Sequence, residues 1–343
     1  MKHTQFSHLS FKTYAFLLLF AAEFTYYLLI LQTGIVQYHH SVMSQIWMVP
    51  AGGILGIVLS IFVHSKKEWL LPLLLLVQLI LSVDYADANA LELFGLGLLS
   101  GLTAPMLLFR IDRLWVAVAA LALSYAFGTA MFHVEAIDRT GIALFLTLLA
   151  LAASFFAGRG EKKALNETKI SLFSMAKVFL WLLLDAALFE TLSRDSLMHL
   201  WGSETFTLTL IVSHLVGVAV AYRLRDWKQT DVVLLLLFVM TYTAYSSGSS
   251  LLLCLVYPFV ISYYNVIILD KLRKLDYLPL AVMSLSLWGA SGLGLLIALS
   301  HTFAIAWIVL LLLAGIVVAE SLGFQTLRGI SRFTFTSFKG YTL

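Results

Sequence analysis

The chain has 343 residues, of which 61% are hydrophobic and 12% are charged, and its mean hydropathy is +0.93. Soluble proteins carry about 25% charged residues, so this composition excludes a soluble enzyme, a disordered chain and a nucleic-acid-binding protein. The formal net charge of +3 is too small to act as a general field on a partner. The one cysteine, Cys254, excludes an intrachain disulfide. The composition therefore indicates a membrane protein with many spans.

Apolar runs long enough to cross a membrane recur along the whole chain. A spanning helix needs about 20 apolar residues because the hydrocarbon core is about 30 Å thick. Loops between the runs are too short for a soluble domain. The predicted spans are 14–37, 44–63, 69–86, 91–109, 114–132, 140–157, 172–192, 205–222, 231–247, 249–269, 278–300 and 303–322.

The basic residues predict the orientation of these spans. If both ends of the chain are cytoplasmic, every one of the 22 Lys and Arg residues except Arg139 and Arg194 lies on the cytoplasmic side. The positive-inside rule produces such a bias when the number of spans is right. We therefore predict twelve spans with both termini cytoplasmic, and the very short loops favour the cytoplasmic membrane of a bacterium.

The two halves of the chain repeat several features weakly. An acid lies in the middle of the first and of the seventh span, at Glu23 and Asp185, and a proline lies in the fourth and tenth, at Pro105 and Pro258. Such repeats are common among secondary transporters. We predict an N-terminal six-helix lobe at 1–157, a cytoplasmic linker at 158–170, a C-terminal six-helix lobe at 171–322, and a basic and aromatic cytoplasmic tail at 323–343.

Small residues are concentrated in spans two, five, eight and eleven. Small side chains let helices approach closely, so these spans are expected at an interface. Spans three, six, nine and twelve are bulkier and rich in leucine, as lipid-facing helices would be.

With this plan of twelve spans, a 6+6 division and cytoplasmic ends, the chain resembles the major facilitator superfamily (MFS) over essentially its whole length. Of the loop signature G-x-x-x-D-R-x-G-R-K of that family, Ser60–Lys67 keeps the basic pair without the Gly and the Asp, and Ala221–Asp226 keeps charges in altered order. The resemblance implies an all-α membrane fold of two pseudo-symmetric six-helix lobes. It also implies a central cavity lined by helices 1, 4, 7 and 10, with helices 2, 5, 8 and 11 between the lobes.

Ionisable side chains inside a membrane are costly and are therefore candidates for function. Glu23 and Asp185 are expected to face each other across the pseudo-twofold axis, and a carboxylate there can load and release protons. Tyr26 and Tyr27 follow Glu23 by three and four residues, which predicts that they share its helical face. We expect the two acids to contact the substrate and to couple transport to protons. The alternative is that each acid is hydrogen-bonded to a hydroxyl group and fixes helix packing.

Other polar residues of the spans are weaker candidates. Glu190 lies near the outer interface and is expected to reach water. His214 is expected either to pack in the core or to relay protons. The tenth span has the densest polar and aromatic stretch, and its candidate ligand contacts are Tyr257, Tyr264 and Asn265. Further candidates for the cavity wall are Gln32, Ser100 and Thr103.

The charges that the spans lack also bear on function. Apart from Lys177 near an inner end, no Lys or Arg lies within a span, whereas carriers of anions usually need a buried cation. We therefore predict a secondary active transporter that works by alternating access, coupled to protons, for a small cationic or neutral, partly apolar solute. No cofactor and no enzymatic activity are expected, since no catalytic or nucleotide-binding motif is present. We expect a monomer in the lipid bilayer.

Two alternatives remain open from the sequence. One is a protein with the same fold that does not transport and instead serves as a membrane assembly or scaffold protein. The other is an importer of copper or another transition metal, because imidazole and thioether ligands gather on the predicted outer side. The candidate metal ligands are His39, His40, Met43, Met131, His133, Met198 and His199.

Overall fold

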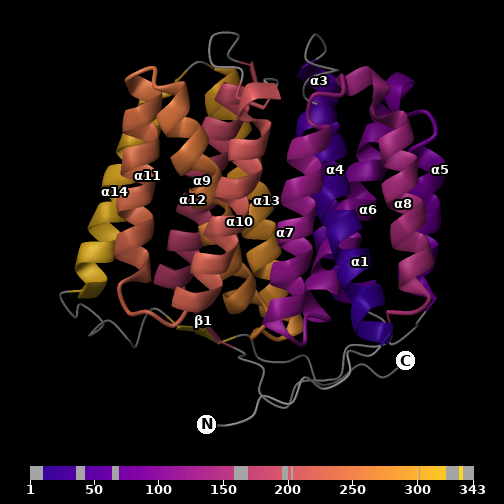
Figure 1. The fold of residues 1–343 in the computed structure, drawn as a ribbon. Coiled ribbons are helices and arrows are strands. Elements are labelled where there is room, and N and C mark those ends of the chain that lie inside the picture. Colours follow the sequence, from indigo (N-terminus) through magenta and orange to yellow (C-terminus); the bar gives the residue numbers. More distant parts are fainter. Residues whose placement is uncertain are drawn as a thin grey trace.

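The computed structural model describes residues 11–35, 43–63, 69–157, 169–194, 200–201, 204–300, 302–321 and 332–334, and these form a bundle of helices that run up and down (Figure 1). Its first half begins with α1 (Phe11–Tyr26), which continues without a break as the π-helix η1 (Tyr27–Gly34). The next elements are α3 (Met43–Ile46), α4 (Met48–Val63), α5 (Leu70–Leu81), the 3₁₀-helix η2 (Tyr85–Asp87), α6 (Ala90–Phe109), α7 (Leu114–Met131), the 3₁₀-helix η3 (Ala136–Arg139) and α8 (Thr140–Ser154).

The second half begins after a short strand and has six long helices. They are α9 (Leu172–Arg194), α10 (Glu204–Leu224), α11 (Thr230–Ser246), α12 (Ser250–Leu272), α13 (Tyr277–Leu299) and α14 (Ala304–Ser321). Gly248 has a φ of 70°, which suits glycine, and it closes the tight turn that separates α11 from α12. Strand β1 (Lys169–Ser171) pairs antiparallel with β2 (Arg332–Thr334), so the predicted linker and the predicted tail meet.

The helices follow the predicted apolar runs to within a few residues at most of their ends. Among the described residues, nine helices are long and apolar enough to cross a membrane, and α4, α5 and α11 are apolar but shorter. The shortest, α5, has 12 residues and rises about 18 Å, less than the thickness of a hydrocarbon core. An all-α polytopic membrane protein is thus confirmed as the fold class. The full count of twelve crossings and their orientation stay predictions.

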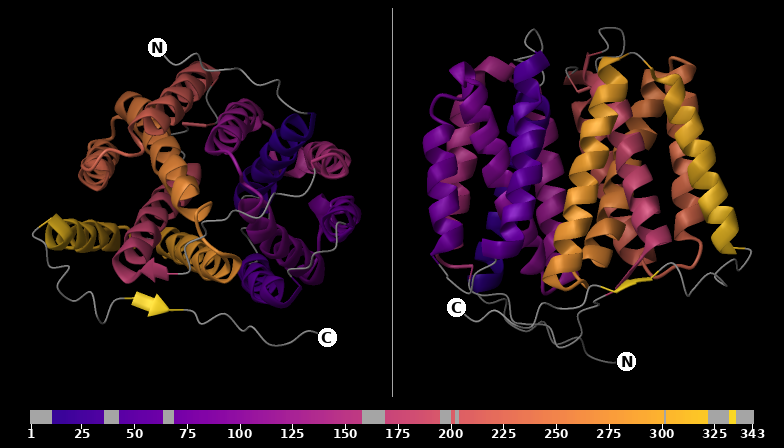
Figure 2. Two further views of the ribbon diagram at one scale, coloured as in Figure 1. Left: turned by 90° about the horizontal axis from the view of Figure 1, so that it is seen from below. Right: turned by 180° about the vertical axis from the view of Figure 1, so that it is seen from behind.

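Most contacts between helices lie within one half of the chain. In the first half α1 packs against α7 and α8, α4 against α6, and α5 against α6 and α8. In the second half α9 packs against α13, α10 against α12, and α11 against α12 and α14. The halves meet where α7 lies beside α10 and α4 beside α13, as the view from below shows (Figure 2).

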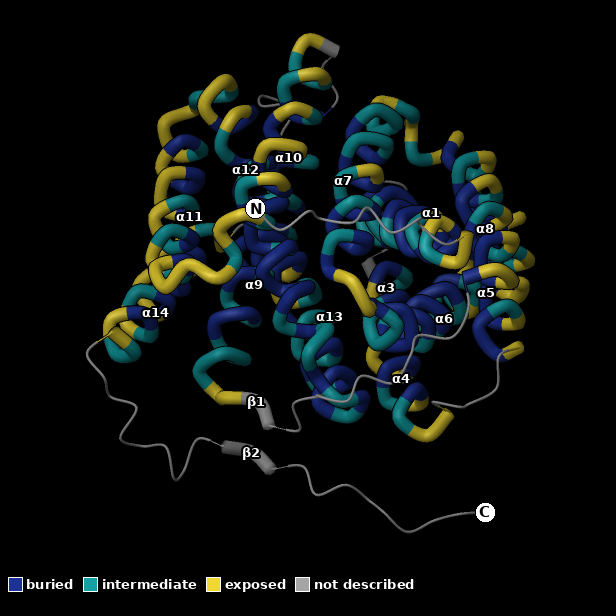
Figure 3. The backbone as a smooth tube through the Cα atoms, turned by 60° about the horizontal axis from the view of Figure 1, so that its bottom comes forward, coloured by how far each residue is buried: buried dark blue, intermediate teal, exposed yellow. Residues whose placement is uncertain are grey.

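Burial increases from the outside of the bundle to its centre (Figure 3). Large apolar side chains remain exposed on the outer face, among them Ile308, Leu311 and Leu312 of α14. A surface of this kind is stable against lipid and unfavourable in water. The interior is filled by one extensive cluster of apolar side chains from all the long helices.

Glycines bring α4 and α6 into backbone contact. A Cβ on Gly56 of α4 would lie 2.2 Å from the carbonyl oxygen of Leu98, and one on Gly97 of α6 would lie 2.2 Å from that of Val49. Small residues permit such close packing between membrane helices. The contact lies inside the first half, so the prediction that the small residues of span two serve the interface between halves is wrong for this face of α4. Gly53, on another face, does lie against Trp288 of α13.

A buried arginine holds the π-helical end of the first span. Arg139 of η3 is 1% exposed, and its guanidinium donates to the carbonyl oxygen of Leu29 and to the hydroxyl of Thr33, both at 3.0 Å. The same group donates to the carbonyl oxygens of Val134 and Phe132 at 3.0 Å. Four hydrogen bonds therefore compensate the burial of this charged group, which has lost its water. Arg139 thereby ties η1 to the end of α7.

The glycine contact predicts a steric effect on stability. Gly97→Ala places a methyl group against the backbone of α4, so we expect the free energy of unfolding to fall by about 1–3 kcal/mol. Thermal unfolding of the purified protein in detergent measures this. The matched control is Gly141→Ala in α8, where no atom lies within 4 Å of the added Cβ. Equal unfolding temperatures for the two variants would contradict the close packing of α4 and α6.

The arginine predicts a second effect. Arg139→Lys keeps the positive charge but removes most of the donors, at a cost of about 1–3 kcal/mol for each carbonyl left unpaired. We expect a lower unfolding temperature for this variant and no change for the control Arg113→Lys, since Arg113 is exposed. The same unfolding temperature for Arg139→Lys as for wild type would refute the role of the guanidinium.

Candidate functional site

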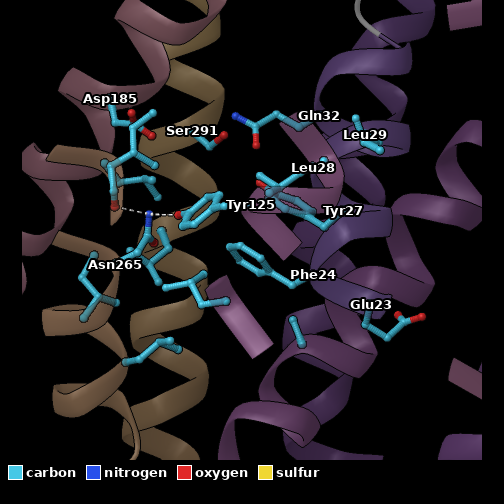
Figure 4. A pocket seen from close by; sticks show the side chains of 18 of the residues that line it. Glu23, Phe24, Tyr27, Leu28, Leu29, Gln32, Tyr125, Asp185, Asn265 and Ser291 are labelled. Carbon is cyan, nitrogen blue, oxygen red and sulfur yellow. Dashed lines mark hydrogen bonds between the residues drawn. The ribbon is translucent and has the colours of Figure 1, made fainter. Parts of the chain in front are cut away.

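A cavity of about 230 Å³ lies at the centre of the bundle, between the two halves (Figure 4). Its wall is formed by α1 and η1, α6 and α7 from the first half and by α9, α10, α12 and α13 from the second. Aromatic and aliphatic side chains make up most of this wall. No Lys or Arg of the described residues lines it. Gln32, Ser100 and Thr103, which the sequence suggested as cavity residues, lie in the wall.

The carboxylate of Asp185 is held in the wall by two tyrosines. Tyr257 and Tyr264, both on α12, donate hydrogen bonds to its two oxygens at 2.9 and 2.5 Å. Tyr257 also bonds the backbone oxygen of Asp185 at 3.0 Å, and the side chain of Asp185 lies halfway along α9. A buried carboxylate requires such donors because it has lost its water. The structure thus brings together the acid of span seven and the tyrosines of span ten.

A second set of polar contacts joins the halves beside this acid. The amide of Asn265 on α12 donates to the hydroxyl of Tyr125 on α7 at 2.8 Å, and also to the backbone of Ile261 (Figure 4). The ring of Tyr125 stacks on that of His214 from α10, with the centroids 4.4 Å apart. His214 in turn bonds the hydroxyl of Ser262 through Nδ1 at 2.8 Å. His214 therefore lies in the cavity wall and is also packed and hydrogen-bonded.

Of the two tyrosines predicted to share the face of Glu23, Tyr26 does and Tyr27 does not. Consecutive helical residues point about 100° apart, and the π-helix begins at Tyr27. Tyr26 bonds Ser82 at 2.7 Å on the side of α5. Tyr27 instead points into the cavity, where its ring packs edge-on against Trp288 at 5.8 Å.

The two central acids do not face each other either. Both contribute to the cavity wall, but the carboxylate of Glu23 is turned away from Asp185 (Figure 4). Its Oε1 accepts a hydrogen bond from Nε2 of Gln78 on α5 at 3.1 Å. Gln78 is 1% exposed, so this bond lies inside the first half. The expected pairing across the pseudo-twofold axis is therefore wrong, because helix packing directs Glu23 toward α5.

Glu190 is buried, contrary to the prediction that its side chain reaches water. It is 3% exposed and lines a smaller cavity of about 50 Å³ with Tyr27, Gln32 and Trp288. Its helix α9 packs against α13, and Ser291, Gly292 and Leu295 of α13 line the same small cavity.

A cluster of aromatic side chains lines the cavity near the start of α10. Trp201 packs edge-on against Tyr257 at 5.7 Å and against Phe189 at 5.0 Å. It also contacts Phe132 of the first half at 6.1 Å, and the guanidinium of Arg139 lies 5.1 Å from the same Phe132 ring. Rings from both halves therefore meet at this end of the cavity.

The charged residues at the other end of the second half form a cluster of their own. Lys177 of α9 is paired with Asp231 of α11 and with Glu320 of α14. The ammonium group of Lys271 lies 4.7 Å from the ring of Trp181. These contacts join the lower ends of four helices and leave the cavity free of cations.

The predicted metal ligands gain no support from the described residues. His39, His40, Met198 and His199, and the side chain of Met43, lie outside the part of the chain that the structure describes. Met131 and His133 lie at the end of α7, where Nδ1 of His133 contacts the backbone oxygen of Ala130 at 2.7 Å. Within the described ranges no three His, Cys, Asp or Glu side chains gather as a metal site would require.

Sequence reasoning missed three residues of the site, which are Tyr125, Trp288 and Gln78. Tyr125 and Trp288 are large aromatic residues within helices rich in small ones, and this contrast is a signal that the sequence carries. Gln78 carries no comparable signal, since it lies in a leucine-rich helix predicted to face lipid. No protein-family model and no curated protein matches this chain.

The tyrosine clamp predicts an energetic coupling. Hydrogen bonds to a charged group contribute about 1.5–3 kcal/mol, so Tyr264→Phe should destabilise the protein by this amount. In the background Asp185→Asn the same change should cost less, and a double-mutant cycle in thermal unfolding gives the difference. The control is Tyr14→Phe on the exposed face of α1, which should add to Asp185→Asn without coupling. Additive effects of Tyr264→Phe and Asp185→Asn would contradict the bond.

Proposed function

We propose that this protein is a secondary active transporter that moves a small cationic or neutral, partly apolar solute by alternating access, coupled to protons. The observation that carries the proposal is the central cavity, whose wall comes from both halves and holds the buried carboxylate of Asp185. Buried ionisable groups in membrane proteins mark substrate and proton pathways. A wall shared by two bundles is what rocking of one bundle against the other requires.

The size and the lining of the cavity support the class of solute. Cavities for drug-sized ligands are about 300–1,000 Å³, so a cavity of about 230 Å³ suits a smaller molecule. Aromatic rings such as Tyr27 and Trp288 attract organic cations through their faces. The acid supplies the opposite charge, and no basic side chain among the lining residues competes for it.

The packing of the helices supports the two-lobed plan of the MFS for this transporter. The cavity is lined by α1, α6, α9 and α12, which are the first, fourth, seventh and tenth long helices, as that plan implies. The fifth, eighth and eleventh, α7, α10 and α13, also reach the cavity and carry the contacts between halves. In this plan the ends of the chain lie in the cytoplasm of a bacterium.

Transport is measured with benzyltrimethylammonium, a small aromatic cation whose charge does not change with pH. Vesicles that contain the purified protein should move the labelled cation when a pH gradient is imposed, and empty vesicles should not. We expect Asp185→Asn to slow this flux about ten-fold or more, because the counter-charge is lost.

The matched control is Asp112→Asn, since Asp112 is exposed between α6 and α7. This variant should transport like wild type. A wild-type protein that moves neither this cation nor a neutral aromatic amine with either direction of the gradient would refute the proposed function.

A further inference from the structure

The two central acids differ in what surrounds their carboxylates. The carboxylate of Asp185 accepts hydrogen bonds from the hydroxyl groups of Tyr257 and Tyr264 at the cavity wall. The carboxylate of Glu23 accepts a hydrogen bond from the amide of Gln78 inside the first half. In the close-up view Phe24 and Tyr27 lie between the two acids (Figure 4). The two carboxylates therefore occupy separate sites.

The hydrogen-bond partners of the acids differ in their chemistry. The hydroxyls at Asp185 both donate to its carboxylate, and each tyrosine oxygen can also accept a hydrogen bond. The amide of Gln78 has two N–H donors and a carbonyl acceptor. It can donate to a carboxylate and, after rotation, accept from a carboxylic acid. The partner of Glu23 thus remains satisfied in both protonation states.

Few titratable groups surround Glu23. The charge of Glu23 acts on Tyr26 of its own helix, which is bonded to Ser82 beyond α5. The neighbourhood of Asp185 is richer, and its charge acts on hydroxyls from four other elements, those of Tyr27, Tyr125, Tyr242, Tyr257 and Tyr264. No basic side chain of the described residues is bonded to either carboxylate. Within the described part of the chain, neither acid therefore has a fixed counter-ion.

The rings near Asp185 suit an organic cation. Tyr27 packs edge-on against Trp288 at 5.8 Å, and Phe24 packs edge-on against Tyr125 at 6.0 Å. All four residues line the cavity together with Asp185. Glu23 also lines the cavity, while its carboxylate accepts a hydrogen bond from Gln78.

We propose, on the basis of the transport function above, that the two acids divide the work of coupling. Asp185 binds the positively charged group of the solute within the aromatic wall. Glu23 binds and releases the coupled proton and does not touch the solute. In the proton step one O–H bond forms on Glu23 from a proton on one side of the membrane and breaks toward the other side. The solute itself undergoes no chemical change.

The experiment separates binding from coupling in the full-length protein. Equilibrium binding of labelled benzyltrimethylammonium to purified protein should weaken about ten-fold or more in Asp185→Asn. In Glu23→Gln binding should stay within about two-fold of wild type, because in this proposal Glu23 does not touch the solute. The same variant should lose movement of the cation driven by a pH gradient, while exchange of labelled for unlabelled cation across the vesicle membrane persists. Glu135→Gln, at an exposed position, should behave as wild type in every assay.

A second variant tests the proton site without altering the acid. Gln78→Leu removes the amide that bonds Glu23, so it should displace the pH profile of transport while binding of the cation is kept. A residue that only packs would change protein yield and stability without moving this profile. If Glu23→Gln does not fold, Gln78→Leu still tests whether Glu23 is the proton site.

The outcomes distinguish this proposal from the function on which it rests. Loss of cation binding in Glu23→Gln, or gradient-driven movement at the wild-type rate in that variant, would overturn the division of roles while leaving a transporter. An unchanged pH profile in Gln78→Leu would do the same. Absence of both binding and flux in the wild type would remove the proposed function and the division with it.

Discussion

The burial of one carboxylate in an apolar bundle constrains the centre of this protein. A charged group that has lost its water is stable only when donors replace it, and Asp185 finds them in two tyrosines of a different helix. Tyr257 bonds both the side chain and the backbone of Asp185, and Tyr242 of α11 bonds the carbonyl oxygen of Leu184 next to it. Four hydrogen bonds thus fix the middle of α9 to α11 and α12. These bonds hold the part of the cavity wall that contains Asp185 in place.

Irregular backbone near the cavity has its own supports. The first span changes from α-helix to π-helix at Tyr27, and the carbonyl of Leu29 there accepts a hydrogen bond from Arg139. The hydroxyl of Ser213 in α10 donates to the carbonyl oxygen of Leu255 in α12, three residues before Pro258, which has no backbone N–H. Backbone groups inside a membrane need such partners because no water is available. Both places lie in helices that line the cavity, and both receive side-chain hydrogen bonds from neighbouring elements.

Helix positions and several site residues could be predicted because the signals are local. A run of apolar residues specifies a membrane helix whatever it packs against, and the density of tyrosines in span ten marks that helix as unusual. Asp185, Tyr257, Tyr264 and Asn265 were found in this way. The partners of Glu23 and Glu190 could not be predicted, because the direction of a side chain depends on the rotation of its helix. Such rotation is decided by contacts between segments far apart in the chain, as between Glu23 and Gln78.

The sequence by itself determined that the chain is an all-helical membrane protein, where its helices lie and which few polar residues they carry. These properties follow from the cost of exposing backbone and charge to hydrocarbon, and that cost acts on each segment separately. Tertiary structure alone decided that Tyr26 packs beside α5 while Tyr27 lines the cavity, that Glu190 is buried, and that the two central acids have different partners. Packing sets these directions, and packing depends on the glycine contacts and ring contacts of all the helices at once.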